Sequence, residues 1–268
     1  MRSAVPPASI GAVIRGADSA ARAVAGGFIV GCIADADRWS ARKGGAAAVV
    51  TGVPAPPFNG VLTVETDAAP GDVEDLLGRV EATGLTHFLQ VREGTDPAIA
   101  RLAVSRGMTR DEDVPLMVLD DLGALDEELP AELFLRQLEP SEREVHTRVA
   151  AEGFEEDFDL LDRYVSPAMM ALPGVRCYVG IVDGEPVVTG VGFTSGDSVG
   201  IFSVATVPTA RRQGFGAALT RRAILDGAAH GASWAYLQSS PAGFRVYERL
   251  GFRTVELWSF WVGAASGG

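Results

Sequence analysis

The sequence predicts an α/β protein in which helices flank a central mixed sheet. Three observations support this fold class. The chain has 268 residues, of which 47% are hydrophobic, and this is ample for a large core. Strand-like runs at 200–207 and 233–238 enclose a helical segment, an arrangement that makes the two strands parallel. Strand-like and helix-like segments also alternate in the first half of the chain, in a similar order.

The first 125 residues predict one such alternating unit. In order, the residue patterns predict a helix near Pro7 to Ala25, strands at Phe28 to Ile33 and Ala46 to Val50, a turn at Pro54 to Pro57, a strand at Asn59 to Val64, a helix at Asp72 to Thr83, a strand at Thr86 to Val91, a helix at Pro97 to Arg106 and a strand at Pro115 to Leu119. The acidic, turn-forming stretch Asp120 to Pro130 is the predicted linker. We therefore expect two domains, at residues 1–125 (the first half) and 132–268 (the second half).

The loop between the two strands of the second half has the features of an anion-binding site. Val207 and Pro208 end the strand, and a basic, glycine-rich segment then runs directly into a helix, whose first N–H groups are free to face a phosphate. Gly214 and Gly216 allow close approach of the backbone, and two adjacent arginines add positive charge. A diphosphate suits such a loop.

The helix after this loop is predicted from its spacing. Its apolar or small positions share one face, which consists of Leu219, Thr220, Ala223, Ile224 and Gly227. Gly231 ends the helix. Other phosphate loops fit less well. A P-loop needs lysine after its glycine, where this chain has Ala217, and a dinucleotide fold needs a third small residue, where it has Leu219. A turn and helix without any ligand is the remaining alternative.

Two motifs together resemble the GNAT (GCN5-related) N-acetyltransferase family over roughly residues 132–262. The first is Arg211-x-x-Gly214-x-Gly216 after a Val-Pro turn, and the second is Tyr247-Glu248-Arg249-Leu250-Gly251-Phe252. The resemblance implies acetyl-CoA as cosubstrate and a strand that splays from its parallel neighbour to hold the pantetheine arm. It assigns cofactor binding to Val204, Ala205, Thr206, Val207, Arg211, Arg212, Gln213, Gly214, Phe215, Gly216, Ala217 and Ser240.

The resemblance also implies that Tyr247 is the acid that protonates the departing CoA thiolate. Phe244, Tyr247 and Leu250 share one face of a helix that Ser240 and Pro241 begin, which directs the phenol toward the sheet. The alternative is a tyrosine that only packs. Many family members have Asn near the start of this helix, where this chain has Ser239 and Ser240, so a serine either contacts the pantetheine or only caps the helix.

The first half resembles a degenerate copy of the second. His87-Phe88-Leu89-Gln90 matches Ala235-Tyr236-Leu237-Gln238 in pattern, and each is followed by a helix that proline opens. The copy has Ala69-Pro70-Gly71-Asp72 in place of the basic loop, and Val104 in place of the tyrosine. We expect it to bind no CoA, and to have a structural role or to wall the acceptor cleft.

The sequence does not identify the general base or the acceptor. Ser203 lies where a glutamate would be convenient but cannot accept a proton at neutral pH, and the acidic residues Glu152, Glu155, Glu156 and Asp157 are either a base acting through water or a solvated turn. The aromatic strand Leu257 to Val262 is either core or the wall of an apolar acceptor pocket.

Composition excludes several other classes. A net charge of −12 argues against nucleic acid as the main partner. Cys32 and Cys177 are single, far apart in the sequence and without ligand spacing, so they indicate neither a disulfide framework nor a zinc site. The apolar run Ala23 to Ala34 is too short to span a bilayer and follows Asp18 rather than a basic segment. We expect no metal, no membrane and a cytoplasmic location, and the sequence leaves a homodimer open.

The sequence thus predicts an N-acetyltransferase that moves the acetyl group of acetyl-CoA to a primary amine by direct attack in a ternary complex. The acceptor is a small-molecule amine or a protein amine. The alternative is a non-catalytic, regulatory acyl-CoA-binding module that keeps the loop but has lost turnover.

Overall fold

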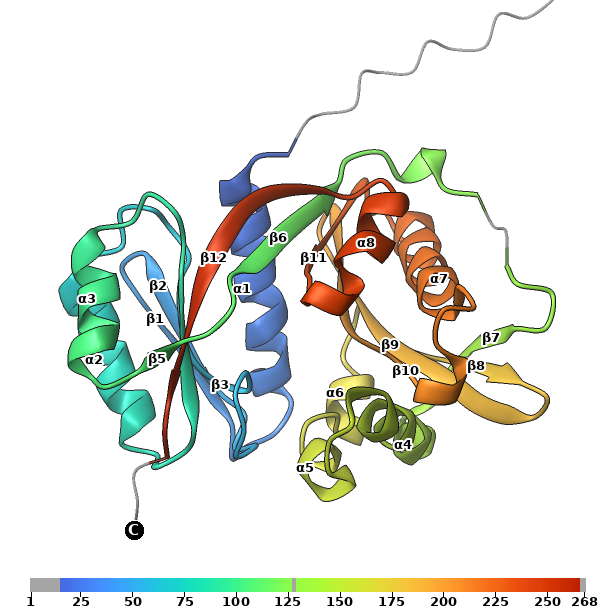
Figure 1. Cartoon of the computed structure of the whole chain (residues 1–268), viewed down its shortest axis with the longest axis horizontal. Coiled ribbons are helices and arrows are strands. Elements are labelled where there is room, and N and C mark those ends of the chain that lie inside the picture. The colour runs from blue at the N-terminus through green and yellow to red at the C-terminus, as the bar shows by residue number, and fades with distance from the viewer. Residues whose placement is uncertain (1–14, 127–128, 266–268) are drawn as a thin grey trace, which may run out of the picture.

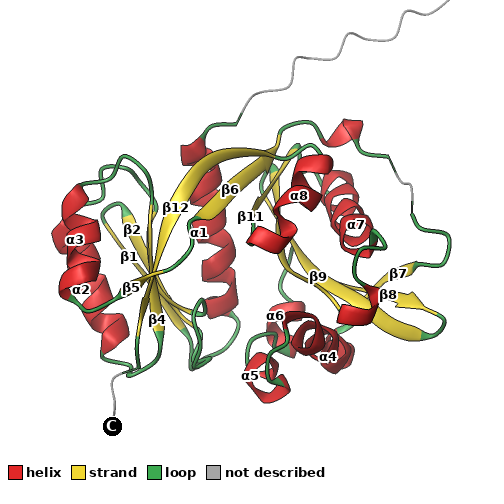
Figure 2. Ribbon diagram, in the orientation of Figure 1, coloured by secondary structure: helices red, strands yellow, loops and turns green. Residues whose placement is uncertain are grey.

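The structure is a computed structural model that describes residues 15–126 and 129–265, with helices on both faces of a mixed sheet (Figure 1, Figure 2). The elements of the first half are α1 (Ala17–Ile33), β1 (Trp39–Lys43), β2 (Ala46–Val50), β3 (Asn59–Thr63), α2 (Pro70–Glu81), β4 (His87–Val91), α3 (Pro97–Ser105), β5 (Thr109–Arg110) and β6 (Val114–Leu119). Those of the second half are β7 (Phe134–Gln137), α4 (Arg143–Phe154), α5 (Phe158–Asp162), α6 (Pro167–Met170), β8 (Val175–Val182), β9 (Glu185–Ser195), β10 (Ser198–Thr206), α7 (Phe215–Ala229), β11 (Trp234–Gln238), α8 (Pro241–Arg249) and β12 (Arg253–Gly263).

The two halves repeat one topology. In the first, β1, β2 and β3 are antiparallel neighbours and α2 connects β3 to the parallel strand β4. In the second, β8, β9 and β10 are antiparallel neighbours and α7 connects β10 to the parallel strand β11. A further helix, α3 or α8, follows each parallel strand. This repetition agrees with the internal duplication expected from the sequence.

The halves exchange strands at their junction. The sheet order is β1-β2-β3-β4-β12-β6-β11-β10-β9-β8-β7, with β5 added beside β12. Thus β6, which ends the first half in sequence, pairs with β11, while β12 at the end of the chain pairs with β4 (Figure 2). The two exchanged strands also pair with each other, which makes the sheet continuous.

A buried ion pair fixes β12 in the first half. Arg92, just after β4, donates to Glu256 of β12 at 2.9 Å, and both side chains are almost fully buried. The indole N–H of Trp258 donates to the same carboxylate at 2.8 Å. Burial makes such a pair costly to break, because either partner alone would be an uncompensated charge. The pair therefore favours the exchanged arrangement.

One predicted element is wrong. Phe28 to Ile33 is not a strand but the last part of α1, and the start of the predicted helix before residue 15 lies outside the described residues. The helix packs on strands of both halves (Figure 1). Because it contacts strands of both halves, its sequence lacks the continuous polar face that identifies an amphipathic helix, and the apolar residues from Phe28 to Ile33 imitate a buried strand. The strands β1 and β5 were not predicted.

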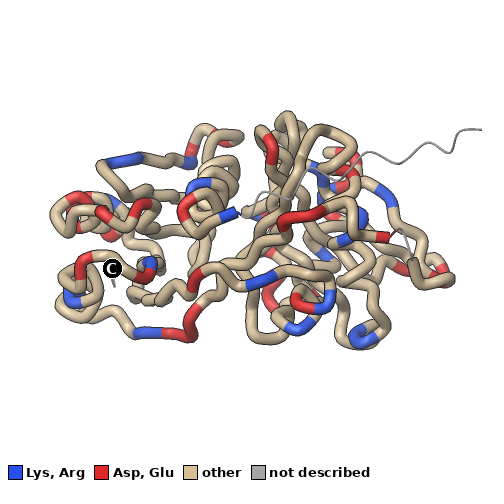
Figure 3. Tube along the Cα trace, turned by 90° about the horizontal axis from the view of Figure 1, so that it is seen from above, with Lys and Arg blue, Asp and Glu red and all other residues tan. Residues whose placement is uncertain are grey.

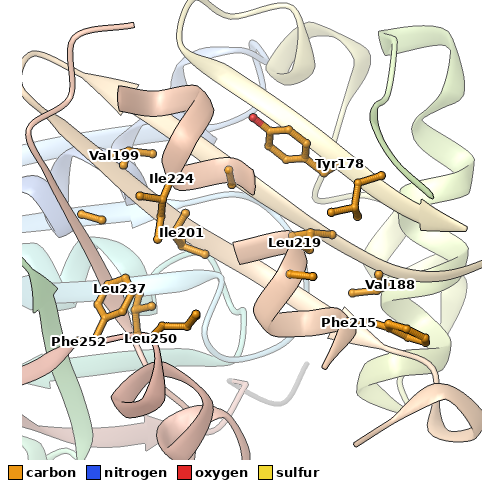
Figure 4. Packing of buried hydrophobic residues seen from close by; sticks show 14 of the residues in the cluster. Tyr178, Val188, Val199, Ile201, Phe215, Leu219, Ile224, Leu237, Leu250 and Phe252 are labelled. Carbon is orange, nitrogen blue, oxygen red and sulfur yellow. The ribbon is translucent and has the colours of Figure 1, made fainter. Parts of the chain in front are cut away.

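The core of the second half confirms the predicted face of α7. All five residues of that face, Leu219, Thr220, Ala223, Ile224 and Gly227, are buried. Phe215, Leu219 and Ile224 face side chains of the sheet that include Val188, Val199 and Ile201 (Figure 4). Gly227 lies so close to Val199 that a Cβ atom would be 2.7 Å from it, so the small residue is needed for this packing.

Charges of both signs are interspersed along the trace (Figure 3). None of the helices in the described part of the chain combines the length and the apolar character that crossing a membrane requires.

Candidate active site

The loop before α7 forms a concave set of backbone N–H groups. Gly214 is the N-cap residue of α7 and has a left-handed backbone (φ 85°), and Arg212 is also left-handed (φ 66°). No side chain caps this helix, and the first intrahelical bond runs from the Ala218 N–H to the Gly214 carbonyl at 3.0 Å. The N–H groups of Phe215, Gly216 and Ala217 precede that bond, so they can bind an anion.

Side chains divide the loop into an inner and an outer part. Phe215 is buried in the core and anchors the helix start, whereas Arg211, Arg212, Gln213 and Gly214 are exposed. The guanidinium of Arg211 donates to Glu155 at 2.9 Å and to the carbonyl of Gly153 at 2.9 Å. Arg211 thus ties the loop to the end of α4, and among the described residues Arg212 has no such partner.

The predicted splay between parallel strands is present. β10 pairs with β11 only over Ser198–Gly200, and from Ile201 onward its edge on that side has no strand partner. A bulge between Phe202 and Ala205 interrupts the pairing with β9, and Ser203 there has a positive φ of 51°. Such a bulge redirects the backbone and leaves polar groups free for a ligand.

The four predicted pantetheine residues lie along this free edge. Ala205 and Thr206 pair with β9 on their other side, Val204 lies in the bulge, and the N–H of Val207 donates to the Val187 carbonyl at 3.0 Å. The Val207 carbonyl in turn accepts from the Ala210 N–H at 2.9 Å, so both backbone groups of Val207 already have partners.

Ser240 is the N-cap residue of α8, as its sequence context predicts. Its Oγ accepts from the Gly243 N–H at 3.3 Å, and Ser239 Oγ donates to the Ser240 carbonyl at 2.8 Å. The Ser240 hydroxyl proton is not used by this cap, so Ser240 can still donate to a ligand.

Tyr247 faces the sheet from α8. Its ring makes an edge contact with Phe252, with ring centroids 5.9 Å apart, and burial raises the pKa of its phenol to about 12. The phenol is therefore protonated throughout the neutral range. It lines a cavity that Ser203, Val204 and Ser240 also line, so the structure brings these four predicted or weighed positions together.

The comparisons identify the family of this region. A family model described as an acetyltransferase (GNAT) domain matches residues 173–254, which include the loop, the splayed strand and Tyr247. Residues 173–254 therefore form a GNAT acetyltransferase domain. No curated protein is significantly similar to the chain in sequence.

Solved structures extend the likeness in fold to nearly the whole chain. A GCN5-related N-acetyltransferase from Kribbella flavida is 22% identical with a TM-score of 0.68, and the match covers 93% of this chain and 96% of that one. One from Sphaerobacter thermophilus is 16% identical with a TM-score of 0.58, covering 84% and 82%. A tandem GNAT protein from the clavulanic acid biosynthesis pathway is 17% identical with a TM-score of 0.55, covering 85% and 84%.

The cavity beside the GNAT domain's splayed strand has a volume of about 590 Å³ and is walled by both halves. The first half contributes the turn at 55–58, Gln90 and the segment 111–114. The second half contributes α4, the segment that follows it, the bulge of β10 and the start of α8. Of the two roles that the sequence allowed for the first half, structural support or a wall of the cleft, the second agrees with its residues in this cavity.

The cavity has an aromatic interior and an acidic edge. Six phenylalanine and tyrosine rings besides Tyr247 line it: Phe28, Phe58, Phe154, Tyr164, Phe202 and Phe260. Exposed carboxylates of Asp111, Glu112, Asp113 and Glu156 line it as well. Of the aromatic strand at Leu257 to Val262, Phe260 contributes to the cavity, while Trp258 is fully buried in the core.

His146 also lines the cavity, although its sequence context did not indicate this. It lies on α4, is 2% exposed, and its Nδ1 is 2.7 Å from Thr189 Oγ1 of β9. A lone histidine in a helix is usually a core residue, and only the packing of α4 against β9 places this one at the cavity.

The equivalent site in the first half is built differently. β3 pairs with β2 in continuous register and has no bulge, and α2 starts after Ala69 without a basic loop. The Asp72 carboxylate lies against Gly44, where a Cβ atom would be 2.3 Å from Oδ2, and contacts Lys43 at 3.4 Å. A carboxylate thus occupies the helix start, where it would repel a phosphate.

Proposed function

We propose that this protein is an N-acetyltransferase that transfers the acetyl group of acetyl-CoA directly to a primary amine. The observation that carries the proposal is the continuity of three features: the amide-lined loop at the start of α7, the free edge of β10, and the cavity that contains Tyr247. A nucleotide diphosphate, an extended arm and an acyl group need these three environments in this order.

The loop would hold the diphosphate of CoA. The N–H groups of Phe215, Gly216 and Ala217 face outward at the positive end of the α7 dipole, and Arg212 adds an unshared guanidinium. Arg211 can contribute once it leaves Glu155, because their ion pair is solvent-exposed and therefore weak. The pantetheine arm would then follow Val204 to Val207 along the free edge.

In the reaction, the amine nitrogen forms a bond to the thioester carbonyl carbon while the bond from that carbon to sulfur breaks. The amine loses a proton and the sulfur gains one. Tyr247, with a pKa of about 12, donates a hydrogen bond to the departing sulfur. Complete proton transfer from this phenol to a thiolate of pKa about 8.5 is uphill, so we assign it chiefly the stabilisation of developing negative charge.

The acidic edge of the cavity supports an amine as acceptor. Carboxylates from both halves, Asp113 and Glu156 among them, would attract a cationic substrate, and the aromatic interior would hold the carbon skeleton beside the reacting nitrogen. A cavity of about 590 Å³ accepts a small molecule or the end of a side chain.

The test is CoA release, measured with a thiol reagent, across a panel of amines that vary in aromatic content and charge. Release that depends on both acetyl-CoA and one amine supports the proposal. Calorimetry that shows tight CoA binding without release for any amine would instead support the regulatory acyl-CoA-binding module.

The same calorimetry tests the role of the first half. We propose one CoA per chain, because Asp72 occupies the helix start there and β3 lacks the bulge. A stoichiometry of two would contradict the degenerate copy.

A further inference from the structure

His146 occupies a position unlike that of the other histidines of the described chain. It is 2% exposed and lies on the face of α4 that packs against β9 and β10, yet it lines the 590 Å³ cavity that holds Tyr247 and the bulge of β10. His230, by comparison, is exposed at the end of α7.

Hydrogen bonding fixes which ring nitrogen of His146 carries the proton. Thr189 Oγ1 is 2.8 Å from the carbonyl of Tyr178, which can only accept, so the single hydroxyl proton is donated there. The same oxygen is 2.7 Å from His146 Nδ1 and must accept from it. His146 is therefore protonated on Nδ1, and Nε2 has a free lone pair.

That lone pair is available to the cavity. Within residues 15–126 and 129–265, Nε2 of His146 has no hydrogen-bond partner. The atom is not fully enclosed either, because it is absent from the set of completely buried side-chain atoms that lack a partner. Burial lowers the pKa of the imidazole to about 4, so the ring is neutral at pH 7. A neutral, oriented imidazole facing a substrate cavity has the geometry of a general base.

The carboxylates that the sequence offered as bases are less suitable. Glu155 is paired with Arg211 at 2.9 Å, and Asp157 accepts from the Asp159 N–H at 2.7 Å as the N-cap residue of α5. Of the four, only Glu156 lines the cavity, and it is exposed. Glu156 is therefore the one rival that a test must include.

We propose that His146 Nε2 is the general base that accepts the proton of the attacking amine, an inference that rests on the acetyltransferase function proposed above. The amine nitrogen bonds to the acyl carbon, its N–H becomes acidic as that bond forms, and the proton moves to Nε2. The bond to sulfur breaks and Tyr247 stabilises the departing thiolate by a hydrogen bond. His146 then releases its proton to solvent, and the thiolate takes one proton from solvent, so that free CoA thiol and the amide are the products. Thr189 is a positioning residue that holds the tautomer.

Kinetics of His146→Asn test the base. The asparagine amide can replace Nδ1 toward Thr189 but offers nothing at Nε2, so we expect kcat to fall about 100-fold with CoA affinity unchanged. Imidazole added to His146→Ala should restore part of the rate. His230→Asn is the matched control and should keep the wild-type rate.

The outcomes separate the two proposals. If no amine of the panel causes the wild-type protein to release CoA from acetyl-CoA, the proposal of an acetyltransferase function is wrong. If the wild-type protein is active and His146→Asn keeps kcat within about threefold of it, the base assignment alone fails. A large loss in Glu156→Gln together with an active His146→Asn would make the carboxylate the base.

A second measurement needs neither variant nor activity. Nitrogen-15 NMR of the wild-type protein at pH 7 should show His146 with a protonated Nδ1 and an unprotonated Nε2. A proton on Nε2 would overturn the proposal, because the lone pair would then face Thr189 instead of the cavity.

Discussion

Gln90 and Gln238 exchange hydrogen bonds through their side-chain amides, with N to O distances of 3.3 and 3.1 Å. They are the corresponding residues of the two matched segments, one near the end of β4 and the other at the end of β11. A reciprocal contact between equivalent residues is the signature of two repeats related by a local twofold axis. Both residues line the cavity, which therefore lies where the two copies meet.

This pairing predicts a coupling between Gln90 and Gln238. Gln90→Leu should lower the free energy of unfolding by about 1–2 kcal/mol, because the Gln238 amide would lose its partner. Gln90→Leu combined with Gln238→Leu should cost less than the sum of the two single changes. Urea unfolding measures all three variants, with Gln137→Leu on the exposed edge strand as control. Strict additivity would show that the two amides do not depend on each other.

Replacing Gly214 should separate CoA binding from stability. Gly214 and Gly231 lie at opposite ends of α7, have φ values of 85° and 99°, and have nothing within 4 Å of the position of a Cβ atom. Valine at either position should be strained by a similar amount, about 1–2 kcal/mol, which thermal unfolding can verify. Only Gly214→Val should abolish CoA binding in calorimetry, because only Gly214 shapes the amide-lined loop. Equal loss of binding in both variants would contradict this role.

Tyr247→Phe should slow turnover and leave CoA binding intact. Removing one hydrogen-bond donor to a developing charge costs about 100-fold in kcat or more. Since the phenol has a pKa of about 12, its proton is present at every pH below that value, and the alkaline limb of the rate profile should be the same in both proteins. Tyr178→Phe is the control, because that hydroxyl is 3.0 Å from Asp226, away from the cavity. An unchanged kcat in Tyr247→Phe would leave Tyr247 as a packing residue.

The sequence was most informative where one short segment determines the structure. The loop from Arg211 to Gly216 and the apolar face of α7 encode their backbone locally, through glycine, proline and helical spacing, and both were predicted correctly. The pattern match of His87 to Gln90 with Ala235 to Gln238 likewise anticipated equivalent strands.

Features that depend on contacts between distant segments were not predictable in this way. The exchange of β6 and β12 depends on pairings such as Arg92 with Glu256, which are 164 residues apart. The segment Phe28 to Ile33 was mistaken for a strand because α1 contacts strands of both halves, and these contacts cannot be read from the sequence of the helix itself. His146 is recognisable only through Thr189, a partner on another element.

The last prediction concerns pH and the stability of the CoA-free protein. Folding lowers the pKa of His146 from 6.5 to about 4, so the unfolded chain binds an extra proton between these values. The contribution of His146 to the free energy of unfolding is therefore greatest above pH 6.5. It is lost as the pH falls toward 4, by about 3 kcal/mol in all. The titratable groups that line the same cavity are Asp111, Glu112, Asp113, Glu156, Tyr164 and Tyr247.

Because carboxylates line the same cavity, the difference between two proteins is needed to isolate the histidine. We expect the urea-unfolding free energy of His146→Asn to vary less between pH 6.5 and 4 than that of the wild-type protein, while His230→Asn should follow the wild type. Equal slopes for His146→Asn and the wild type would mean that folding does not lower the pKa of the imidazole. The ring would then not be the neutral, buried group from which the assignment of Nε2 as a base was argued.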